Sequence, residues 1–412
     1  MMRFFVTVAC CLIAGGVSAE ERSPPMEIEL HTYWKTEGER GALSSLVESM
    51  GSLNLQVNIV ESEEYNVLRQ NVSKRIGLGY PPEISQWLGG ENLEQLVGED
   101  TIFLSPQFSD RDVLRNEIHP EVIEQITVDG SIYAIPVGIH LQNSMIYNMD
   151  LLAKVGVYDL PETWAEFDGL VAKLRAASIL PYAGSAKPWV INNLFDSLTV
   201  SVGQRDLMEE LYSGKAAETS IRAPIHETMG HFVKLRNLTG PDGDGREWDD
   251  AVRMVIEGDA AITIIGDYAW SEISTHGVGD LSQYRCSALP GLDSPFFGVD
   301  IFVAFETSLP DWHRQYGEML EVILRQDVQY QYLQKKGGIS VVKGIDPDGL
   351  NPCSRVSLER WEQAPEQRFS DPGSRDHGST AIIQAVLFEI WRNQKLTTQE
   401  ATDLFLVRLG RD

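Results

Sequence analysis

Cysteine, cationic side chains and long apolar runs are all scarce in this sequence. Its 412 residues hold four cysteines, and 34 Lys and Arg stand against 60 Asp and Glu, for a formal charge of −26. Such an acidic surface repels nucleic acid and anionic lipid, which argues against both as partners. Past the N-terminus no stretch has 18 uninterrupted apolar residues, so the pattern predicts no membrane-spanning helix.

Signatures of catalysis are also missing. The sequence has no HExxH, no P-loop, no GxGxxG and no GxSxG followed by a helix. Carboxylates are so numerous that chance pairs are guaranteed, so no pair indicates glycosidase chemistry. Asp242 and Asp244 resemble the start of a calcium loop, but Arg246 stands where an oxygen ligand belongs. The sequence therefore predicts a protein that is not an enzyme and that has no metal site and no cofactor.

The N-terminus predicts export. Arg3 precedes an apolar run, residues 4–17, and the segment 17–19 fits the small-x-small cleavage rule. We interpret residues 1–19 as a secretory signal peptide. The run is about 14 residues, short of the ~20 that a spanning helix needs, which disfavours a membrane anchor. Cys10 and Cys11 lack the preceding small residues of a lipoprotein signal, which disfavours that alternative too.

Two cysteines remain after cleavage, Cys286 and Cys353. Export to an oxidising compartment favours a disulfide between them over two free thiols. In the chain-entropy model a loop of that span stabilises by about 4 kcal/mol. We interpret the bridge as a structural clip.

Strand and helix patterns alternate through the first part of the mature chain. Alternation predicts strands at 27–34, 53–60 and 83–88, and helical spacing predicts helices at 39–50 and 65–76. This order predicts an α/β fold with a parallel sheet covered by helices. Ligands in such sheets bind at the carboxyl ends of the strands, which here carry Trp34 and Trp87.

The stretch 135–189 predicts a crossing between two lobes. Residues 135–147 form two extended pieces broken at Gln142 and Asn143, and a short helix follows at 148–155. Thr163 and Glu166 then have the spacing of a capping box, which opens an amphipathic helix. A strand that passes through a polar corner into a new helical region is expected at a hinge.

The rest of the chain continues in the same manner. The patterns predict helices at 225–238, 247–257, 312–334, 381–392 and 397–409, and strands at 260–265 and 296–305. The strand at 260–265 again ends in a polar and aromatic corner, 266–270.

Aromatic residues recur beside hydrogen-bonding groups at these strand ends. Trp34 lies near Glu39, Gln86 precedes Trp87, and Asp267 precedes Tyr268 and Trp270. An indole or phenol ring suits the C–H face of a sugar, and carboxylates, amides and Lys suit its hydroxyls. Each aromatic taken alone belongs to a core more often than to a ligand platform, but the repetition at strand ends favours ligand contact for Trp34 and Trp270.

Three further side chains stay open between two roles. His140 and His377 are either ligand contacts or satisfied structural histidines. Asp300 lies in an apolar strand, so its carboxylate is either buried and paired or functional, because burying it unpaired costs too much.

The sequence resembles the periplasmic solute-binding proteins of carbohydrate ABC importers, most closely the glucose/mannose-binding group. The segments that carry the likeness span nearly the whole mature chain: LHTYWKTEGERGAL (30–43), IHLQNSMIYNMDLLAKVGV (139–157), LPETWAEF (160–167), KPW (187–189), REWDDAVRMVIEGDAAITIIGDYAW (246–270), CSALPG (286–291) and QKKGGIS (334–340).

The resemblance implies two α/β lobes joined by a multi-segment hinge, a Venus flytrap that closes on a sugar. We expect an N-terminal lobe of residues 20–137 plus about 295–341, and a C-terminal lobe of 138–294 plus about 342–412. By position, the sugar contacts of the family fall on Trp34, Glu39, Gln86, His140, Asp267, Trp270, Asp300, Lys336 and His377, and we add the neighbouring indoles of Trp87 and Trp189. Cys286 and Cys353 match the disulfide of the family.

The sequence departs from the family pattern at three places. Leu88 replaces a common Lys, Gly298 replaces a common Asn, and Tyr268 stands where a Trp is usual. Losing two hydroxyl partners can redirect specificity. A monosaccharide such as glucose is therefore one expectation, and a larger, modified or acidic sugar or a short oligosaccharide is the other.

The prediction is a monomeric periplasmic protein that captures a carbohydrate and presents it to an ABC transporter permease. Two other hypotheses use the same fold. In one the protein reports sugar occupancy to a membrane histidine kinase, and in the other it is a secreted carbohydrate-active enzyme. Genes beside this one would separate transport from sensing, and a test for glycoside hydrolysis would identify the enzyme.

Overall fold

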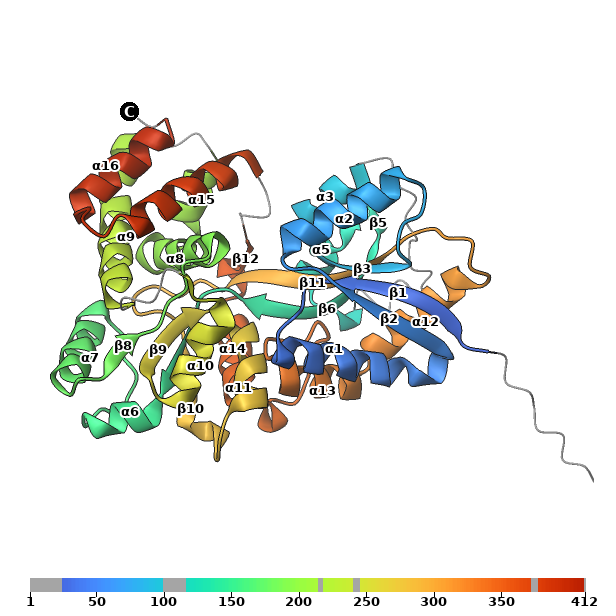
Figure 1. The fold of residues 1–412 in the computed structure, drawn as a ribbon, viewed down its shortest axis with the longest axis horizontal. Helices are drawn as coiled ribbons and strands as arrows, with labels where there is room; N and C mark the ends of the chain where they lie inside the picture. The colour runs from blue at the N-terminus through green and yellow to red at the C-terminus, as the bar shows by residue number, and fades with distance from the viewer. Residues whose placement is uncertain (1–23, 99–115, 214–217, 240–244, 372–376, 411–412) are drawn as a thin grey trace, which may run out of the picture.

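The computed structural model describes residues 24–98, 116–213, 218–239, 245–371 and 377–410. They form two lobes, each with its own sheet and helices, that lie side by side (Figure 1). The signal peptide expected at residues 1–19 lies outside the described residues, as do residues 242–244 of the calcium-like turn.

The first lobe begins with the predicted order of strands and helices. Its elements are β1 Met26–Thr32, α1 Glu37–Ser49, β2 Leu55–Glu61, α2 Tyr65–Gly77, β3 Ile84–Leu88, α3 Glu91–Gly98, α5 Pro120–Gln125 and the small hairpin β4 Thr127–Val128 with β5 Ser131–Ile132. Strand β1 pairs in parallel with β2 and with β3, as the sequence predicts. Thr36 caps α1 through a capping box with Glu39, which fixes the start of this helix beside the end of β1.

Two later strands extend the sheet, and one of them, β11, Phe296–Ala304, runs in the opposite direction to β1, β2 and β3. Strand β11 pairs antiparallel with β3, and β6, Ala134–Leu141, pairs antiparallel with β11. Only part of the sheet is therefore parallel, which corrects the wholly parallel sheet expected from the first elements. The antiparallel insertion places Asp300 directly opposite Leu88 at the carboxyl end of β3.

The single helix predicted at 312–334 is in fact two, α12 Trp312–Ile323 and α13 Gln326–Lys336. Arg325 between them has an extended backbone, with ψ of 135°. The buried amide of Gln329 donates to the carbonyl oxygens of Ile323 and Val137 at 3.1 Å, so the carbonyl at the end of α12 keeps a partner although the helix stops.

The second lobe is built on a four-stranded sheet of order β10-β7-β9-β8. Its elements are β7 Ser144–Asn148, α6 Met149–Lys154, α7 Trp164–Ala176, β8 Leu180–Tyr182, α8 Pro188–Tyr212, α9 Glu218–Leu238, α10 Trp248–Glu257, β9 Ala260–Ile265, α11 Trp270–His276 and β10 Tyr284–Ser287. The capping box of Thr163 and Glu166 opens α7 as predicted. Helix α8 is long and mostly buried, and sequence reasoning did not predict it.

The C-terminal part returns to both lobes. Helix α14, Pro352–Gln363, and the short strand β12, Phe369–Ser370, lie where the lobes meet, and α15 His377–Arg392 and α16 Thr398–Arg408 cover the second lobe (Figure 1). The buried guanidinium of Arg236 donates to the carbonyl oxygens of Ile390 and Asn393, which satisfies the end of α15.

The chain passes between the lobes at several places. Strand β6 belongs to the first sheet and β7 to the second, and Gln142 and Asn143 join them. The chain returns between β10 and β11, and it leaves again after β12, which pairs with β11. At this boundary Phe296 stacks on Phe369, with ring centroids 5.6 Å apart, within the core of the second lobe.

The predicted disulfide is confirmed: Cys286 of β10 is bonded to Cys353 of α14, with Cα atoms 5.1 Å apart. Helix α14 is thus fastened to the second lobe at its first turn, while Leu358 and Trp361 nearer its other end pack in the core of the first lobe. The boundaries expected for the lobes stay a prediction, and the first core continues past residue 342 to Trp361.

Candidate functional site

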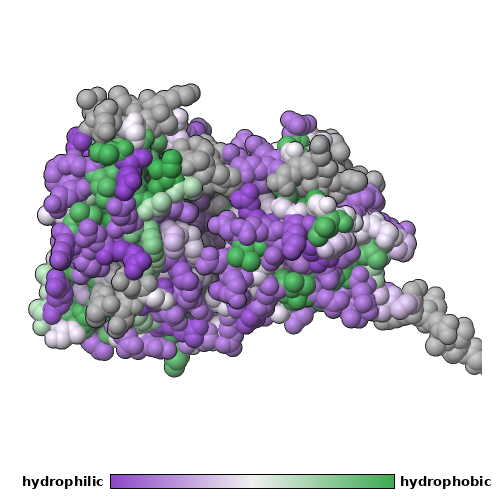
Figure 2. Space-filling model, turned by 45° about the horizontal axis from the view of Figure 1, so that its top comes forward, coloured by the Kyte–Doolittle hydropathy of each residue, from purple (hydrophilic) through white to green (hydrophobic). Residues whose placement is uncertain are grey.

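A cleft of about 560 Å³ lies between the two lobes. Figure 2 shows a recess where the lobes meet, on a face where hydrophilic residues predominate. Residues of both lobes and of the crossing segments line the cleft: Tyr33, Trp34, Lys35, Glu39, Glu63, Glu64, Tyr65, Asn66, Arg69, Leu88, Asn92, His140, Gln142, Trp189, Asn192, Asn193, Asp196, Glu247, Trp248, Tyr268, Phe296, Gly298, Asp300, Lys336, Asp371, Thr380, Ala381 and Gln384.

His140 lies at the centre of a buried polar cluster. Its Nδ1 is 3.1 Å from Asp267 Oδ1, and its Nε2 is 3.3 Å from Asp300 Oδ2. Asp267 follows β9 of the second lobe and also accepts a hydrogen bond from the backbone N–H of Leu141. Burial alone would lower the pKa of His140, but the hydrogen bonds and charges of the two carboxylates outweigh it and raise the pKa. The cluster therefore favours an imidazolium that joins the lobes.

Asp300 is held by neutral donors as well as by His140. The Tyr33 hydroxyl donates to Asp300 Oδ1 at 3.1 Å, and Gln86 Nε2 lies 3.4 Å from the same oxygen. The Thr32 hydroxyl in turn donates to Gln86 Oε1 at 2.5 Å, which fixes the amide. Burial would raise the pKa of Asp300, but the His140 hydrogen bond and charge, with the charge of Lys336, lower it. The carboxylate thus stays ionised at the edge of the cleft.

Lys336 and Glu39 form a second buried pair beside this cluster. Lys336 Nζ donates to Glu39 Oε1 at 3.1 Å, and both side chains are at least nine-tenths buried. The ammonium also lies 4.6 Å from the ring centroid of Trp34 and 5.5 Å from that of Tyr268. Trp34 is itself stacked on Tyr332, so its ring is held between Tyr332 and the ammonium of Lys336.

Contacts between the lobes close the cleft at its floor and at its rim. The Trp270 indole donates to the backbone carbonyl of Gln334 at 3.1 Å. At the rim, Lys187 lies 2.5 Å from Glu247 of its own lobe and 3.9 Å from Glu64 of the other. The two lobes are therefore in contact on either side of the cleft.

The structure brings six of the eleven predicted site residues together in the cleft lining: Trp34, Glu39, His140, Trp189, Asp300 and Lys336. Gln86 and Asp267 lie one layer behind and hold Asp300 and His140. Trp87 is buried in the first core with its indole N–H on the Asn92 carbonyl, and Trp270 is buried between the lobes. The side chain of His377 lies outside the described residues.

All three departures from the family pattern, Leu88, Gly298 and Tyr268, line the cleft. A Cβ at position 298 would meet only the Gln142 amide, at 3.2 Å, so the glycine leaves room at this wall. Burial raises the pKa of the Tyr268 phenol, which therefore stays protonated. Leu88 thus adds an apolar group, and Gly298 leaves out a side chain, where the family pattern has a polar partner.

Sequence reasoning missed several lining residues. Tyr65 and Asn66 open α2 and Trp248 opens α10, so each follows a loop at the cleft edge. Asn192, Asn193 and Asp196 lie on α8, three, four and seven residues after the predicted Trp189. That spacing places them on one helical face, a signal that was present in the sequence but that required α8 to be predicted first.

Residues 53–280 match the family described as bacterial extracellular solute-binding protein. A protein of Brucella melitensis named "Probable sugar-binding periplasmic protein" is 24% identical over 97% of this chain and 96% of its own length. Among solved structures, a chitin oligosaccharide binding protein superposes with a TM-score of 0.76 at 18% identity, covering 94% of this chain and 99% of the other. The bacterial solute receptor AcbH, described as having an exclusive preference for b-D-galactopyranose, superposes with a TM-score of 0.78 at 14% identity, covering 93% and 98%.

The family match covers more than half of the chain, and the fold agrees with it. This protein belongs to the bacterial extracellular solute-binding proteins. Within the described residues, no helix has the length and apolarity that crossing a membrane requires, and no group of three His, Cys, Asp or Glu side chains is arranged to hold a metal ion.

Proposed function

We propose that this protein binds a carbohydrate in the cleft between its lobes and delivers it, in the periplasm, to the permease of an ABC transporter. The observation that carries the proposal is the lining itself: aromatic rings from both lobes alternate with carboxylates, amides and a buried ammonium. A sugar has an apolar face and a belt of hydroxyls, and this combination of groups suits both.

Each group at the centre of the cleft has a role in this proposal. The ionised Asp300 and the carboxyl group of Glu39 accept hydrogen bonds from hydroxyls, and Lys336 donates one. Such charge-assisted bonds contribute about 1.5–3 kcal/mol each. Trp34, held by Tyr332 and Lys336, presents a rigid ring. Because these groups are already oriented, binding orders few side chains, which favours affinity.

His140 links ligand capture to closure in the same proposal. It lies on β6 of the first lobe, next to the crossing, and pairs with Asp267 of the second lobe. A ligand that contacts Asp300, which pairs with His140, and Tyr268, which follows Asp267, contacts both lobes beside this bridge. The closed form is then favoured by the additional contacts that only it makes. We propose no catalytic step, since binding and closure suffice for delivery.

A thermal-shift panel of monosaccharides and disaccharides tests the proposal. A sugar at 100 times its dissociation constant adds about 2.7 kcal/mol of stability, which raises the Tm measurably. The Asp300→Asn variant should weaken that sugar's binding at least about tenfold, whereas Tyr158→Ala, at a side chain 68% exposed and outside the lining, should leave it unchanged. If amino acids or peptides raised the Tm and no carbohydrate did, the proposal would be wrong.

Glucose is the monosaccharide that the family resemblance suggests first. A calorimetric titration with glucose decides between that expectation and a redirected specificity. Tight binding of glucose would show that Leu88 and Gly298 leave room without changing the preferred sugar.

A further inference from the structure

Helix α8 presents a polar face to the cleft although the helix is mostly buried. Trp189, Asn192, Asn193 and Asp196 all line the cleft from its first two turns. Their neighbours Val190, Ile191, Leu194 and Phe195 are buried in the cores of the second lobe. A polar face on a buried helix is not a solvated surface, so these side chains need another reason to be there.

The polar face carries acceptor atoms that the protein leaves without donors. Asn192 is 6% exposed, and its Nδ2 donates to Asp196 Oδ2 at 2.7 Å, which fixes the orientation of the amide. Its Oδ1 is buried and has no hydrogen-bond partner, and the same holds for Oδ1 of Asn193. An unpaired buried acceptor destabilises the empty protein, and a ligand donor that bonded to it would recover that loss.

Asp196 is positioned by the fold to hold this amide. The Tyr212 hydroxyl donates to its carboxyl group at 2.8 Å, from 16 residues further along the same helical segment. A straight helix of that span would place the two about 24 Å apart. Gln204, whose φ of 55° interrupts α8, folds the segment back so that Tyr212 reaches Asp196. Burial and the charge of Asp371 raise the pKa of Asp196, which favours its neutral form.

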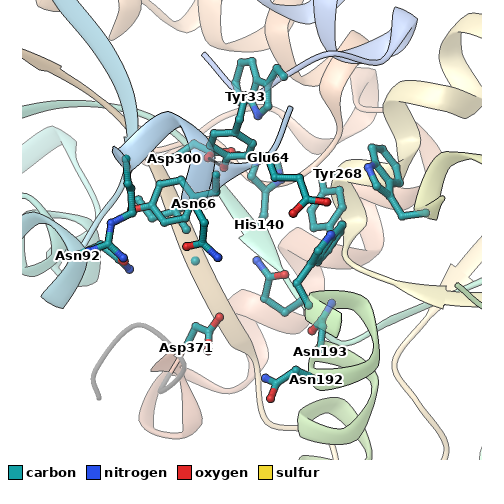
Figure 3. A pocket seen from close by; sticks show the side chains of 18 of the residues that line it. Tyr33, Glu64, Asn66, Asn92, His140, Asn192, Asn193, Tyr268, Asp300 and Asp371 are labelled. Carbon is teal, nitrogen blue, oxygen red and sulfur yellow. Dashed lines mark hydrogen bonds and ion pairs between the residues drawn. The ribbon is translucent and has the colours of Figure 1, made fainter. Parts of the chain in front are cut away.

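The α8 face lies away from the central cluster. In Figure 3, His140 and Asp300 lie at one end of the pocket, and Asn192, Asn193 and Asp371 lie at the other. Trp189, which is partly exposed, also lines the cleft and stands one turn before Asn192 on α8. Clefts of about 300–1,000 Å³ hold ligands of drug size, larger than a single hexose, and this cleft falls in that range.

The charges of the lining select against an anion at this end. Besides His140, the described lining residues include three basic side chains, Lys35, Arg69 and Lys336, and all of them belong to the first lobe. Lys336 is paired with Glu39, and Lys35 lies 3.4 Å from Glu63. Toward the α8 face the lining instead contributes the carboxyl group of Asp371 and the unpaired acceptor oxygens of Asn192 and Asn193. A ligand carboxylate would meet acceptors there and would be repelled.

We infer that the α8 face is a second carbohydrate subsite, so that the ligand has at least two sugar rings and bears no negative charge on the ring beside α8. This inference rests on the proposed carbohydrate binding. One ring lies against Trp34, Asp300 and Lys336, and the next lies against Trp189. Hydroxyl or amide N–H groups of that second ring donate to Asn192 and Asn193.

Isothermal titration calorimetry with matched sugars of one and two rings tests the subsite. The probes are glucose with maltose and cellobiose, galactose with lactose and melibiose, and N-acetylglucosamine with its β-1,4 disaccharide. We expect one disaccharide to bind at least about tenfold more tightly than its monosaccharide. Trp189→Ala should remove most of that difference while changing the monosaccharide affinity less than about twofold. Asn193→Leu should act in the same direction.

The control is Tyr158→Ala, which removes an exposed aromatic ring far from the lining and should leave both affinities unchanged. Oxidising the second ring of the bound disaccharide to a uronate should weaken binding at least about tenfold. Equal affinity for the monosaccharide and every longer sugar, or equal affinity for the uronate, would overturn the subsite while leaving carbohydrate binding intact. Failure of every sugar to bind would overturn both.

Discussion

Arg360 and Asp293 join the segments that connect the two lobes. The guanidinium of Arg360, on α14, donates to both carboxylate oxygens of Asp293 at 2.9 and 2.7 Å. The same group donates to Asn143 Oδ1 at 3.0 Å, and Asn143 Nδ2 donates to the carbonyl of Ser294. Two of the crossings and α14 therefore meet at one side chain that is only 8% exposed.

Removing this contact should loosen the hinge. Arg360→Ala leaves Asn143 and Asp293 without their shared donor, and we expect the free energy of unfolding to fall by about 2 kcal/mol. Urea unfolding measures it. Arg325→Ala is the matched control, because its pair with Asp327 is exposed and should cost less than about 0.5 kcal/mol. Equal small losses in both variants would contradict a structural role for Arg360.

The bridge of His140 should give stability that disappears in alkaline solution. Its pKa in the folded protein is raised above the ordinary 6.5, so the fold binds this proton more tightly than the unfolded chain does. The contribution is therefore complete below about pH 6.5 and is lost as the pH rises through the folded pKa. Between about pH 6 and 9 the wild type should lose more unfolding free energy than His140→Gln. The exposed His313→Gln should follow the wild type, and parallel curves for wild type and His140→Gln would refute the charged bridge.

His231 should produce the opposite dependence. Its ring stacks on Trp164 with centroids 3.9 Å apart, and burial, aided by the charge of Lys234, lowers the pKa of His231 to about 4. The fold therefore favours the neutral ring, and its contribution is complete above the unfolded pKa and is lost as the pH falls toward 4. His231→Phe keeps the stack without the titration. We expect it to lose less stability than the wild type between about pH 6.5 and 4, measured by urea unfolding. An equal loss would contradict this assignment.

Removing the disulfide should lower stability substantially. In the chain-entropy model, Cys286→Ser with Cys353→Ser costs about 4 kcal/mol of unfolding free energy. Dithiothreitol should lower the wild type toward the same value and leave the double variant unchanged, which separates loss of the bond from effects of the two serines. A reductant that acted equally on both proteins would show that the bond is not the cause.

Much of the fold could be predicted because local patterns dominate it. The capping box at Thr163 and the corner at Gln142 and Asn143 were predicted from short spacings alone. The break at Arg325 could not be predicted in this way, because the buried amide of Gln329 that bonds across it gains its partners only through tertiary packing. The antiparallel direction of β11 depends on a return crossing that no local pattern encodes.

The site could be predicted in part for a similar reason. Strand ends and the family resemblance pointed to Trp34, His140, Asp300 and Lys336, all of which line the cleft. Strand ends and family resemblance do not distinguish a lining residue from one in the layer behind it. Asp267 was therefore predicted as a sugar contact like His140, although its carboxylate accepts a hydrogen bond from the Leu141 N–H. The α8 face was missed because its helix was not predicted. Without that helix, nothing in the sequence places Asn192 beside the cleft.

The repeated passage of the chain between lobes has a consequence for the order in which the protein matures. Strand β3 is an inner strand whose neighbour β11 begins at Phe296, after the sheet of the second lobe has been synthesised in full. During synthesis β3 and β6 therefore have exposed edges until residues 296–304 emerge, and such edges invite wrong pairing. The later lobe can thus assemble its sheet before the earlier one, and a fragment cut after Leu141 would be an unfinished, aggregation-prone half.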